Sequence, residues 1–128
     1  MTTYEQLLAD CIRWAKEAGR IQLELFRSDR LDIEAKFNDS DVVTNADKAS
    51  EKAIISEIRR AYPEHSVLSE EAGCDKRMND WLWVIDPLDG TTNYSSGLPN
   101  FCVSIGVQHK GQTVVGVVYA PYLGEIFT

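Results

Sequence analysis

The chain has 128 residues, enough for one modest domain with its own hydrophobic core. It carries 20 acidic and 13 basic residues, and the formal net charge of −7 argues against nucleic acid or an anionic membrane surface as a direct partner. Because the chain lacks both a run of about 18 apolar residues and a leader-like start, we expect a cytoplasmic protein. Cys11, Cys74 and Cys102 lack the spacing of a disulfide framework or a zinc site.

The first predicted element is a long helix. A capping-box pattern at residues 2–6 precedes apolar residues that recur at helical spacing, so we expect the helix over roughly residues 4–28. The next segment, LDIEAKFNDSDVV, alternates around a polar turn. It favours a short hairpin or an extended loop, and it places Lys36 on the first arm.

A second helix is predicted from TNADKASEKAIISEIRRAYP. Thr44 or Asn45 is a suitable N-cap, and Asp47 in the first turn interacts favourably with the helix dipole. Pro63 cannot continue a helix, so the helix ends before it.

The remaining sequence is typical of a sheet. SVLSEE is a short strand that ends in carboxylates, and MNDWLWVID is a second strand. Two β-rich runs follow, joined by a glycine-containing turn at residues 109–112, and YLGEIFT begins a further strand. Helices first and hairpin-connected strands later predict an α+β fold, a layered sandwich of helices on an antiparallel sheet.

Two of the predicted strands end in acidic residues. Glu70 and Glu71 close the first, and Asp86 closes the second, with Asp89 three residues further on. If these strands are neighbours, four carboxylates meet at one edge of the sheet, where they repel one another unless a cation is bound. Oxygen ligands without histidine or cysteine favour Mg²⁺, Mn²⁺ or Ca²⁺ over zinc.

The residues around Asp86 and Asp89 favour a bend that also suits a phosphate group. Pro87 fixes one backbone torsion and Gly90 frees another, so both aspartates can point at one ion with the Leu88 carbonyl beside them. Thr91-Thr92-Asn93 is typical of the start of a short helix, whose free N–H groups suit a phosphate. This combination predicts phosphoryl transfer to water.

Each of these features also has a purely structural interpretation. A D-P-x-D-G segment by itself is more often a polar turn, and Glu70-Glu71 by itself is a solvated strand end. Asp47 is equally typical of an acid that only favours the helix dipole, and Lys36 of a surface lysine.

Taken in order, the segments DVVTNAD, SEE and WVIDPLDGTTNY closely resemble the inositol monophosphatase family of Mg²⁺-dependent, lithium-sensitive phosphomonoesterases. The resemblance implies the N-terminal half of that family's fold and hydrolysis of inositol monophosphate or a related sugar phosphate. Related nucleotide phosphatases typically have lysine after the glycine and threonine. This chain has Thr92-Asn93 there, which favours the inositol phosphate branch.

The resemblance also implies a set of metal ligands. Glu70, Asp86 and the Leu88 carbonyl would hold a first Mg²⁺, and Asp86 with Asp89 would hold a second, with Mn²⁺ as a possible substitute. Li⁺ is expected as an inhibitor on the same grounds. The substrate would be a small-molecule phosphate monoester, attacked in line by metal-activated water, with no nucleic acid or membrane as a direct partner.

Further roles are implied for the residues beside the metals. Thr91, paired with Asp47, would orient the attacking water, and Glu70 is included among the catalytic residues. Lys36 would lie in a loop near the metals. Phosphate and substrate would be held by four consecutive residues, with the amides of the second and third donating: Asp89, Gly90, Thr91 and Thr92.

Family members are about twice this length, so the resemblance implies a single N-terminal domain, residues 1–128, without the family's C-terminal domain. Beyond Asp89 the only acidic residue is Glu125, so a further metal-ligand aspartate would have to come from elsewhere. The complete enzyme is expected to form a homo-oligomer, a dimer. Three alternatives stay open: a fragment that binds metal and phosphate without turnover, a phosphatase of fructose bisphosphate or a nucleotide phosphate, and a structural Ca²⁺-binding domain.

Overall fold

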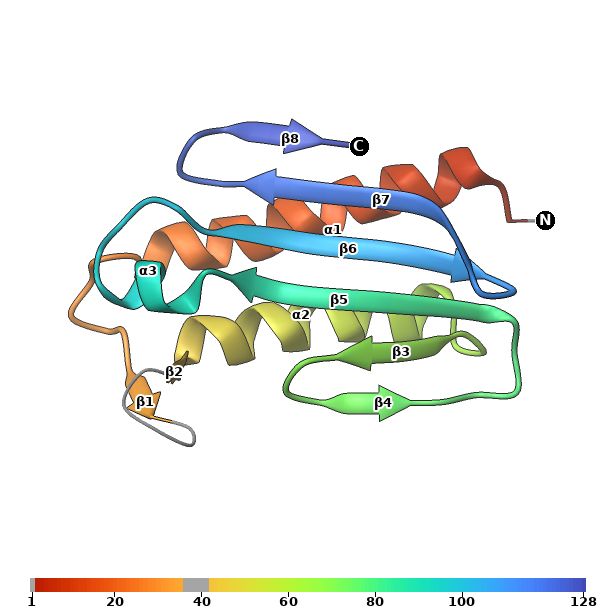
Figure 1. The fold of residues 1–128 in the computed structure, drawn as a ribbon, viewed down its shortest axis with the longest axis horizontal. Helices are drawn as coiled ribbons and strands as arrows, with labels where there is room; N and C mark the ends of the chain where they lie inside the picture. The colour runs from red at the N-terminus through yellow and green to blue at the C-terminus, as the bar shows by residue number, and fades with distance from the viewer. Residues whose placement is uncertain (1, 36–41) are drawn as a thin grey trace.

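The computed structural model describes residues 2–35 and 42–128, so Lys36 lies outside the described residues. Three helices and eight strands follow in the order α1 (Tyr4–Leu25), β1 (Ile33–Ala35), β2 (Val42–Thr44), α2 (Asn45–Ala61), β3 (Ser66–Ser69), β4 (Gly73–Asp75), β5 (Trp81–Asp89), α3 (Thr91–Ser95), β6 (Cys102–His109), β7 (Gln112–Ala120) and β8 (Glu125–Phe127). Figure 1 shows six of the strands side by side in one sheet, with β1 and β2 apart as a small hairpin.

The strand order in the six-stranded sheet is β4-β3-β5-β6-β7-β8. Neighbouring strands run antiparallel, as predicted, except that β3 and β5 run parallel. A parallel pair needs a crossover connection, and here β4 and the segment after it supply that connection. The consequence is that β3 and β5 end at the same edge of the sheet.

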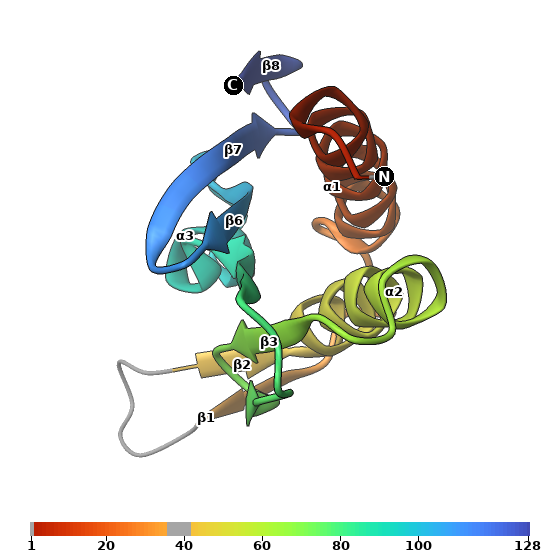
Figure 2. The same ribbon diagram turned by 90° about the vertical axis from the view of Figure 1, so that its right-hand side faces the viewer.

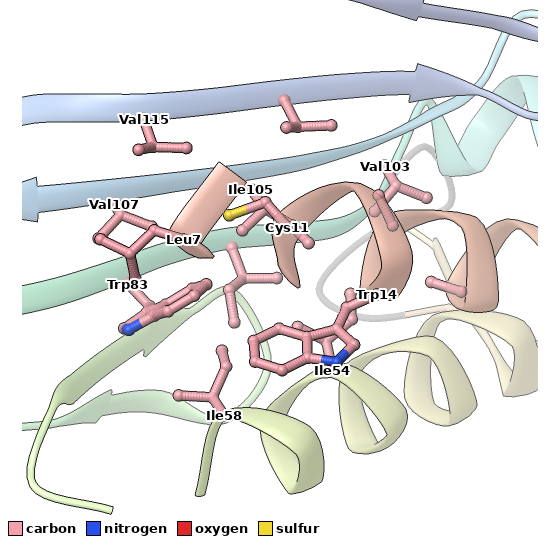
Figure 3. Close-up of a cluster of buried hydrophobic side chains, with 14 of the residues drawn as sticks. Leu7, Cys11, Trp14, Ile54, Ile58, Trp83, Val103, Ile105, Val107 and Val115 are labelled. Carbon is pink, nitrogen blue, oxygen red and sulfur yellow. The ribbon is translucent and has the colours of Figure 1, made fainter. Parts of the chain in front are cut away.

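The molecule has two layers. Helices α1 and α2 lie against the same face of the six-stranded sheet (Figure 2). The main core lies between the helix layer and the sheet, where Trp14 and Ile54 of the helices meet Trp83 and Val107 of the strands (Figure 3). The expected α+β layered sandwich is therefore confirmed. None of the helices among the described residues is long and apolar enough to cross a membrane.

Both long helices begin where the sequence predicts. Thr3 caps α1 in a capping box with Gln6, with two bonds of 3.1 Å. Thr44, one of the two predicted caps, opens α2 in the same way with Asp47. Satisfying the first backbone N–H groups in this manner is what a capping box does.

Several details of the prediction were wrong. Strand β3 ends at Ser69 rather than at residue 71, and β5 covers Trp81–Asp89 rather than residues 78–86, so Asp86 does not close it. Helix α1 ends at Leu25, three residues earlier than expected, because Phe26 takes an extended backbone (φ −60°, ψ 125°) and packs its ring against Phe101 at 5.0 Å between centroids. Strand β4 was not predicted, because its three residues are all exposed and give no alternating pattern.

A second, smaller apolar cluster lies beside the main core. It contains buried Leu88 and Tyr94, which flank the D-G-T-T segment, together with Ala46 and Phe101. Phe26 and Leu25, at the end of α1, pack against it. This cluster anchors the segment between β5 and β6 to the helix layer, so the polar residues between Leu88 and Tyr94 have a fixed support.

Candidate functional site

Three of the four acidic residues predicted to meet, Glu70, Asp86 and Asp89, line one pocket where β3 and β5 end, whereas Glu71 is not among the residues that line it. The parallel register pairs Ser69 with Ile85, so Glu70 and Asp86 are the next residues of two adjacent strands. They open onto a pocket of about 260 Å³. Its lining consists almost wholly of residues predicted from the sequence: Glu70, Asp86, Leu88, Asp89, Gly90, Thr91, Thr92 and Asn93.

The end of β5 departs from regular pairing. Asp86 pairs with Ser104 and Asp89 with Cys102, so the register shifts between the two aspartates and leaves Pro87 and Leu88 as a bulge. A bulge redirects side chains locally and tolerates a proline. The Leu88 side chain points into the second cluster and is 2% exposed, while its carbonyl accepts a bond from the Thr91 hydroxyl at 3.1 Å.

Gly90 makes the turn that follows. Its φ of +87° lies in the left-handed region, and a Cβ there would stand 2.7 Å from the Asn100 carbonyl oxygen, so only glycine fits without movement. The five-residue helix α3 starts directly after it, with the Tyr94 N–H bonded to the Gly90 carbonyl at 2.9 Å. Amides before that first bond have no partner within the helix itself, because a helix leaves its first turn of N–H groups unused.

The predicted pairing of Thr91 with Asp47 is present. The Thr91 hydroxyl donates to Asp47 Oδ1 at 2.8 Å, although the two residues are 44 positions apart. Asp47 is 5% exposed, and its other oxygen accepts from the Thr44 N–H at 2.8 Å and the Thr44 hydroxyl at 2.6 Å. The capping box of α2 thus fixes the carboxylate that Thr91 contacts, and one aspartate serves both the helix start and the pocket.

Sequence reasoning missed Glu51. Its Oε2 accepts from the Ser69 hydroxyl at 2.7 Å and from the N–H groups of Glu71 and Ala72 at 3.1 Å each. It therefore holds the turn that carries Glu70. The sequence feature that could have identified Glu51 is its position four residues after Asp47, which places both acids on one face of α2.

Gln22, on α1, was also missed. It is wholly buried, and its side-chain amide donates to the Pro87 carbonyl inside the bulge at 2.6 Å. A single glutamine on a helix face gives no sequence signal, because glutamine is usually exposed there.

Negative charge accumulates around Asp86. Burial, together with the negative charges of Asp89, Glu70 and Asp47, raises the pKa of its carboxyl to about 6. Asp86 Oδ1 is buried and has no hydrogen-bond partner among the described residues. Burying an unsatisfied charged group is costly, and a bound cation removes that cost.

The predicted ligand residues line one pocket, but their side chains do not yet converge on a single ion position. Within residues 2–35 and 42–128, no three acidic, histidine or cysteine side chains stand close enough to hold one ion. The donor set is nonetheless all oxygen, from carboxylates and the Leu88 carbonyl, which suits Mg²⁺, Mn²⁺ or Ca²⁺. Lys36, expected near the metals, falls in the segment that is not described.

Known proteins of similar sequence match most of the chain. The model of the inositol monophosphatase family matches residues 3–128. The Nus factor SuhB of Pasteurella multocida is 49% identical over 124 residues, which is 95% of this chain and 46% of that protein. The chain therefore spans about half the length of the curated relatives it matches.

Solved structures match over a similar share. An inositol monophosphatase from Anabaena (Nostoc) sp. PCC 7120 is 38% identical with a TM-score of 0.81, covering 98% of this chain and 44% of that one. The lithium-soaked inhibitory complex of Staphylococcal inositol monophosphatase-1 is 25% identical with a TM-score of 0.87, covering 98% of this chain and 48% of that one.

Proposed function

The chain belongs to the inositol monophosphatase family, and we propose that it carries the metal and phosphate loop of a metal-dependent phosphomonoesterase that hydrolyses inositol monophosphate or a related sugar phosphate. The observation that carries the proposal is the convergence in one pocket of acidic strand ends and a glycine turn, beside the Asp47–Thr91 pair. Inositol phosphate as the substrate is supported by solved relatives named inositol monophosphatases, whereas the curated relatives are named as a Nus factor.

Four residues of this chain would hold the metal ions: Glu70, Asp86, Leu88 through its carbonyl, and Asp89. The buried, unpartnered Asp86 Oδ1 supports this, because a cation would satisfy it. When bound, Mg²⁺ or Mn²⁺ supplies Lewis-acid stabilisation of negative charge and lowers the pKa of water. Inhibition by Li⁺ is proposed from the lithium-soaked Staphylococcal relative.

The phosphate group would lie against the turn after β5. The Gly90, Thr91 and Thr92 amides are at the start of α3, where the helix does not use them, and Asp89 stands at the mouth of the same pocket. Helix α3 has five residues, so its dipole is small and hydrogen bonding is the main contribution.

The Asp47–Thr91 pair would position the attacking water. Thr91 Oγ1 has one hydrogen, for which Asp47 Oδ1 at 2.8 Å is the nearer acceptor and the Leu88 carbonyl at 3.1 Å the farther one, so its lone pairs can accept a hydrogen from water. The water oxygen then forms a bond to phosphorus while the ester P–O bond breaks. The proton released by water passes through Thr91 Oγ1 toward Asp47, and the leaving alkoxide takes a proton from solvent, giving an alcohol and inorganic phosphate.

A second candidate function is binding of metal and phosphate without turnover. It is favoured by the positions of the acidic side chains, no three of which stand close enough to hold one ion in the described part of the chain. We propose that residues 1–128 act as one domain in either case, that the complete protein is a homo-oligomer, and that a fructose bisphosphate or nucleotide phosphate is the alternative substrate.

The test is phosphate release from inositol 1-phosphate by this chain across Mg²⁺ concentrations, with Mg²⁺ binding followed by calorimetry. Release and binding are both expected, and Asp86→Asn should abolish both because it removes the carboxylate assigned to both metals. Asp80→Asn is the matched control, since it removes the same charge from an exposed residue at the opposite end of β5. It should leave both unchanged.

The outcomes separate the candidates. Mg²⁺ binding that Asp86→Asn abolishes, without phosphate release, supports the second candidate and contradicts the first. If the chain neither binds Mg²⁺ nor releases phosphate, both candidates are contradicted. Near-normal phosphate release by Asp86→Asn contradicts the assignment of the site.

A further inference from the structure

Gln22 is a buried polar residue at the end of α1 that the motif-bearing segments do not include. Its side chain is 0% exposed, and it lies between helix α2 and the end of β5. Glutamine is seldom fully buried, and a buried amide needs hydrogen-bond partners. Its contacts therefore indicate why a polar group stands there.

The amide nitrogen of Gln22 is directed at β5. Nε2 donates to the Pro87 carbonyl at 2.6 Å and to the Ser50 hydroxyl at 3.1 Å. The orientation of the amide is fixed by chemistry, since a carbonyl oxygen can only accept and must face the NH₂ group. Of the two bonds, the shorter one goes to the bulge between Asp86 and Asp89.

The Pro87 carbonyl depends on this bond because of the bulge. Residues 87 and 88 have no paired residue on β6, since the register passes from Asp86 opposite Ser104 directly to Asp89 opposite Cys102. A buried carbonyl without a ladder partner is destabilising unless another donor reaches it. Gln22 is that donor.

The same peptide group connects Gln22 with Asp86. The carbonyl of the 87–88 peptide accepts from Gln22, and its N–H, that of Leu88, lies near enough to the Asp86 carboxylate to offset part of the rise in the pKa of that carboxyl. A hydrogen bond to one end of a peptide group polarises the other end. Gln22 therefore fixes the plane of the peptide that holds Asp86.

Gln22 also anchors the segment after Gly90. The Tyr94 hydroxyl donates to the Gln22 backbone carbonyl at 2.7 Å, and both groups are buried. One residue of α1 thus holds the chain on both sides of the turn, through its side chain at Pro87 and through its backbone at Tyr94.

Burying Gln22 also leaves one of its polar atoms unsatisfied by the described residues, which costs free energy. Gln22 Oε1 is buried and has no hydrogen-bond partner in the described part of the chain. An apolar side chain of similar volume would avoid that cost but would leave the Pro87 carbonyl without its donor, so what glutamine gains at this position lies in the loop.

We propose that Gln22 is a positioning residue for the metal loop: its amide sets the orientation of the 87–88 peptide and thereby directs the Asp86 carboxylate and the Leu88 carbonyl into the pocket. The effect on metal binding rests on the proposed function, whereas the effect on the loop does not. Residues that support metal ligands in this way typically change metal affinity about 10- to 100-fold when they are replaced.

The test compares Gln22→Met with two controls. Methionine keeps the volume and removes the donor. Tyr62→Phe removes a hydrogen bond of 2.5 Å between α2's C-cap and Asp10 on α1, far from the pocket, and it matches the loss of one tertiary bond. Ser50→Ala removes the other partner of the same Gln22 amide and leaves the Pro87 bond in place.

The first readout is amide hydrogen exchange in the metal-free chain. In Gln22→Met, exchange at Leu88 and Asp89 should accelerate on the order of tenfold relative to both controls, because the Pro87 carbonyl loses its partner. In the wild type, the Gln22 side-chain NH₂ should exchange at least about tenfold more slowly than that of exposed Gln112. The exchange of the Gln22 side-chain NH₂ is measured in the wild type, so it tests whether Gln22 donates to the Pro87 carbonyl even if Gln22→Met fails to fold.

The second readout is Mg²⁺ affinity by calorimetry, which should weaken about tenfold in Gln22→Met and stay within about twofold in the controls. Faster loop exchange with unchanged Mg²⁺ affinity would contradict the assignment to the metal loop. Unchanged exchange, or a rapidly exchanging Gln22 amide, would contradict the proposal itself. If the wild type binds no Mg²⁺, the proposed function fails while the exchange result still decides whether Gln22 orients the loop.

Discussion

The two ends of β5 are opposite in character. At its start, the rings of Tyr62 and His65 stack at 4.9 Å between centroids, His65 and Trp81 at 5.5 Å, and Trp81 and His109 at 4.0 Å. The Trp83 indole N–H donates to His65 Nδ1 at 3.0 Å. This end brings rings together and pairs a buried indole N–H with a buried ring nitrogen.

At its other end the same strand gathers negative charge. Asp86 stands beside Asp89 and Glu70, its carboxyl has a raised pKa, and one of its oxygens is buried without a partner among the described residues. The strand's regular pairing also breaks there. The difference shows that this fold packs aromatic rings at one end of β5 and gathers carboxylates, one of them with a buried oxygen that no described residue satisfies, at the other, as expected of a site completed by a cation.

The largest expected effect comes from Gly90→Ala at the pocket end. The left-handed backbone and the 2.7 Å approach to Asn100 should lower the free energy of unfolding by about 2 kcal/mol and weaken phosphate binding, measured by denaturant titration and calorimetry. Gly116→Ala is the control, because a Cβ there meets nothing within 4 Å. Equal stability of the two variants would show that the turn tolerates other conformations.

Acid should destabilise the ring-stacked end. Burial lowers the pKa of His65, with His109 acting in the same direction and Glu64 opposing it. Because the folded pKa lies below the unfolded value of about 6.5, the unfolded state binds more protons as the pH falls, and stability present above about pH 6.5 is lost below it. The loss is measured by thermal unfolding between pH 7 and pH 5 in an Asp86→Asn background, because the raised pKa of Asp86 would oppose it over that range.

Two variants identify the histidine responsible. His65→Gln should flatten the pH dependence, since it removes the group that protonates, whereas His109→Gln should keep most of it. A slope retained in His65→Gln would assign the acid sensitivity to another group.

The smallest effect is expected from Trp81→Phe. Trp81 is half-buried and stacks on His109, and phenylalanine keeps a ring in the stack, so the free energy of unfolding should change by no more than about 0.5 kcal/mol. Mg²⁺ binding and phosphate release should not change. A large loss of release without loss of stability would mean that the two ends of β5 are coupled.

Much of the pocket could be predicted because its residues are adjacent in sequence or mark element boundaries. Thr44 and Asp47 form a local capping box, and Gly90 sits where a turn needs it. The meeting of Glu70 with Asp86 was conditional on β3 and β5 being neighbours, which sequence periodicity does not determine. Glu51 and Gln22 were missed because each acts on a backbone group far away in sequence.

The sequence by itself determined the helices, most strands and the identity of the acidic and glycine residues, because these depend on local propensity, periodicity and turn chemistry over a few residues. Only the tertiary structure decided that β3 and β5 run parallel and that Asp47 reaches Thr91. It also decided that Gln22 supports the Pro87 carbonyl. The two side-chain contacts join residues 44 and 65 positions apart, and they form only when the helices pack on the sheet and bury the polar groups that must then be paired.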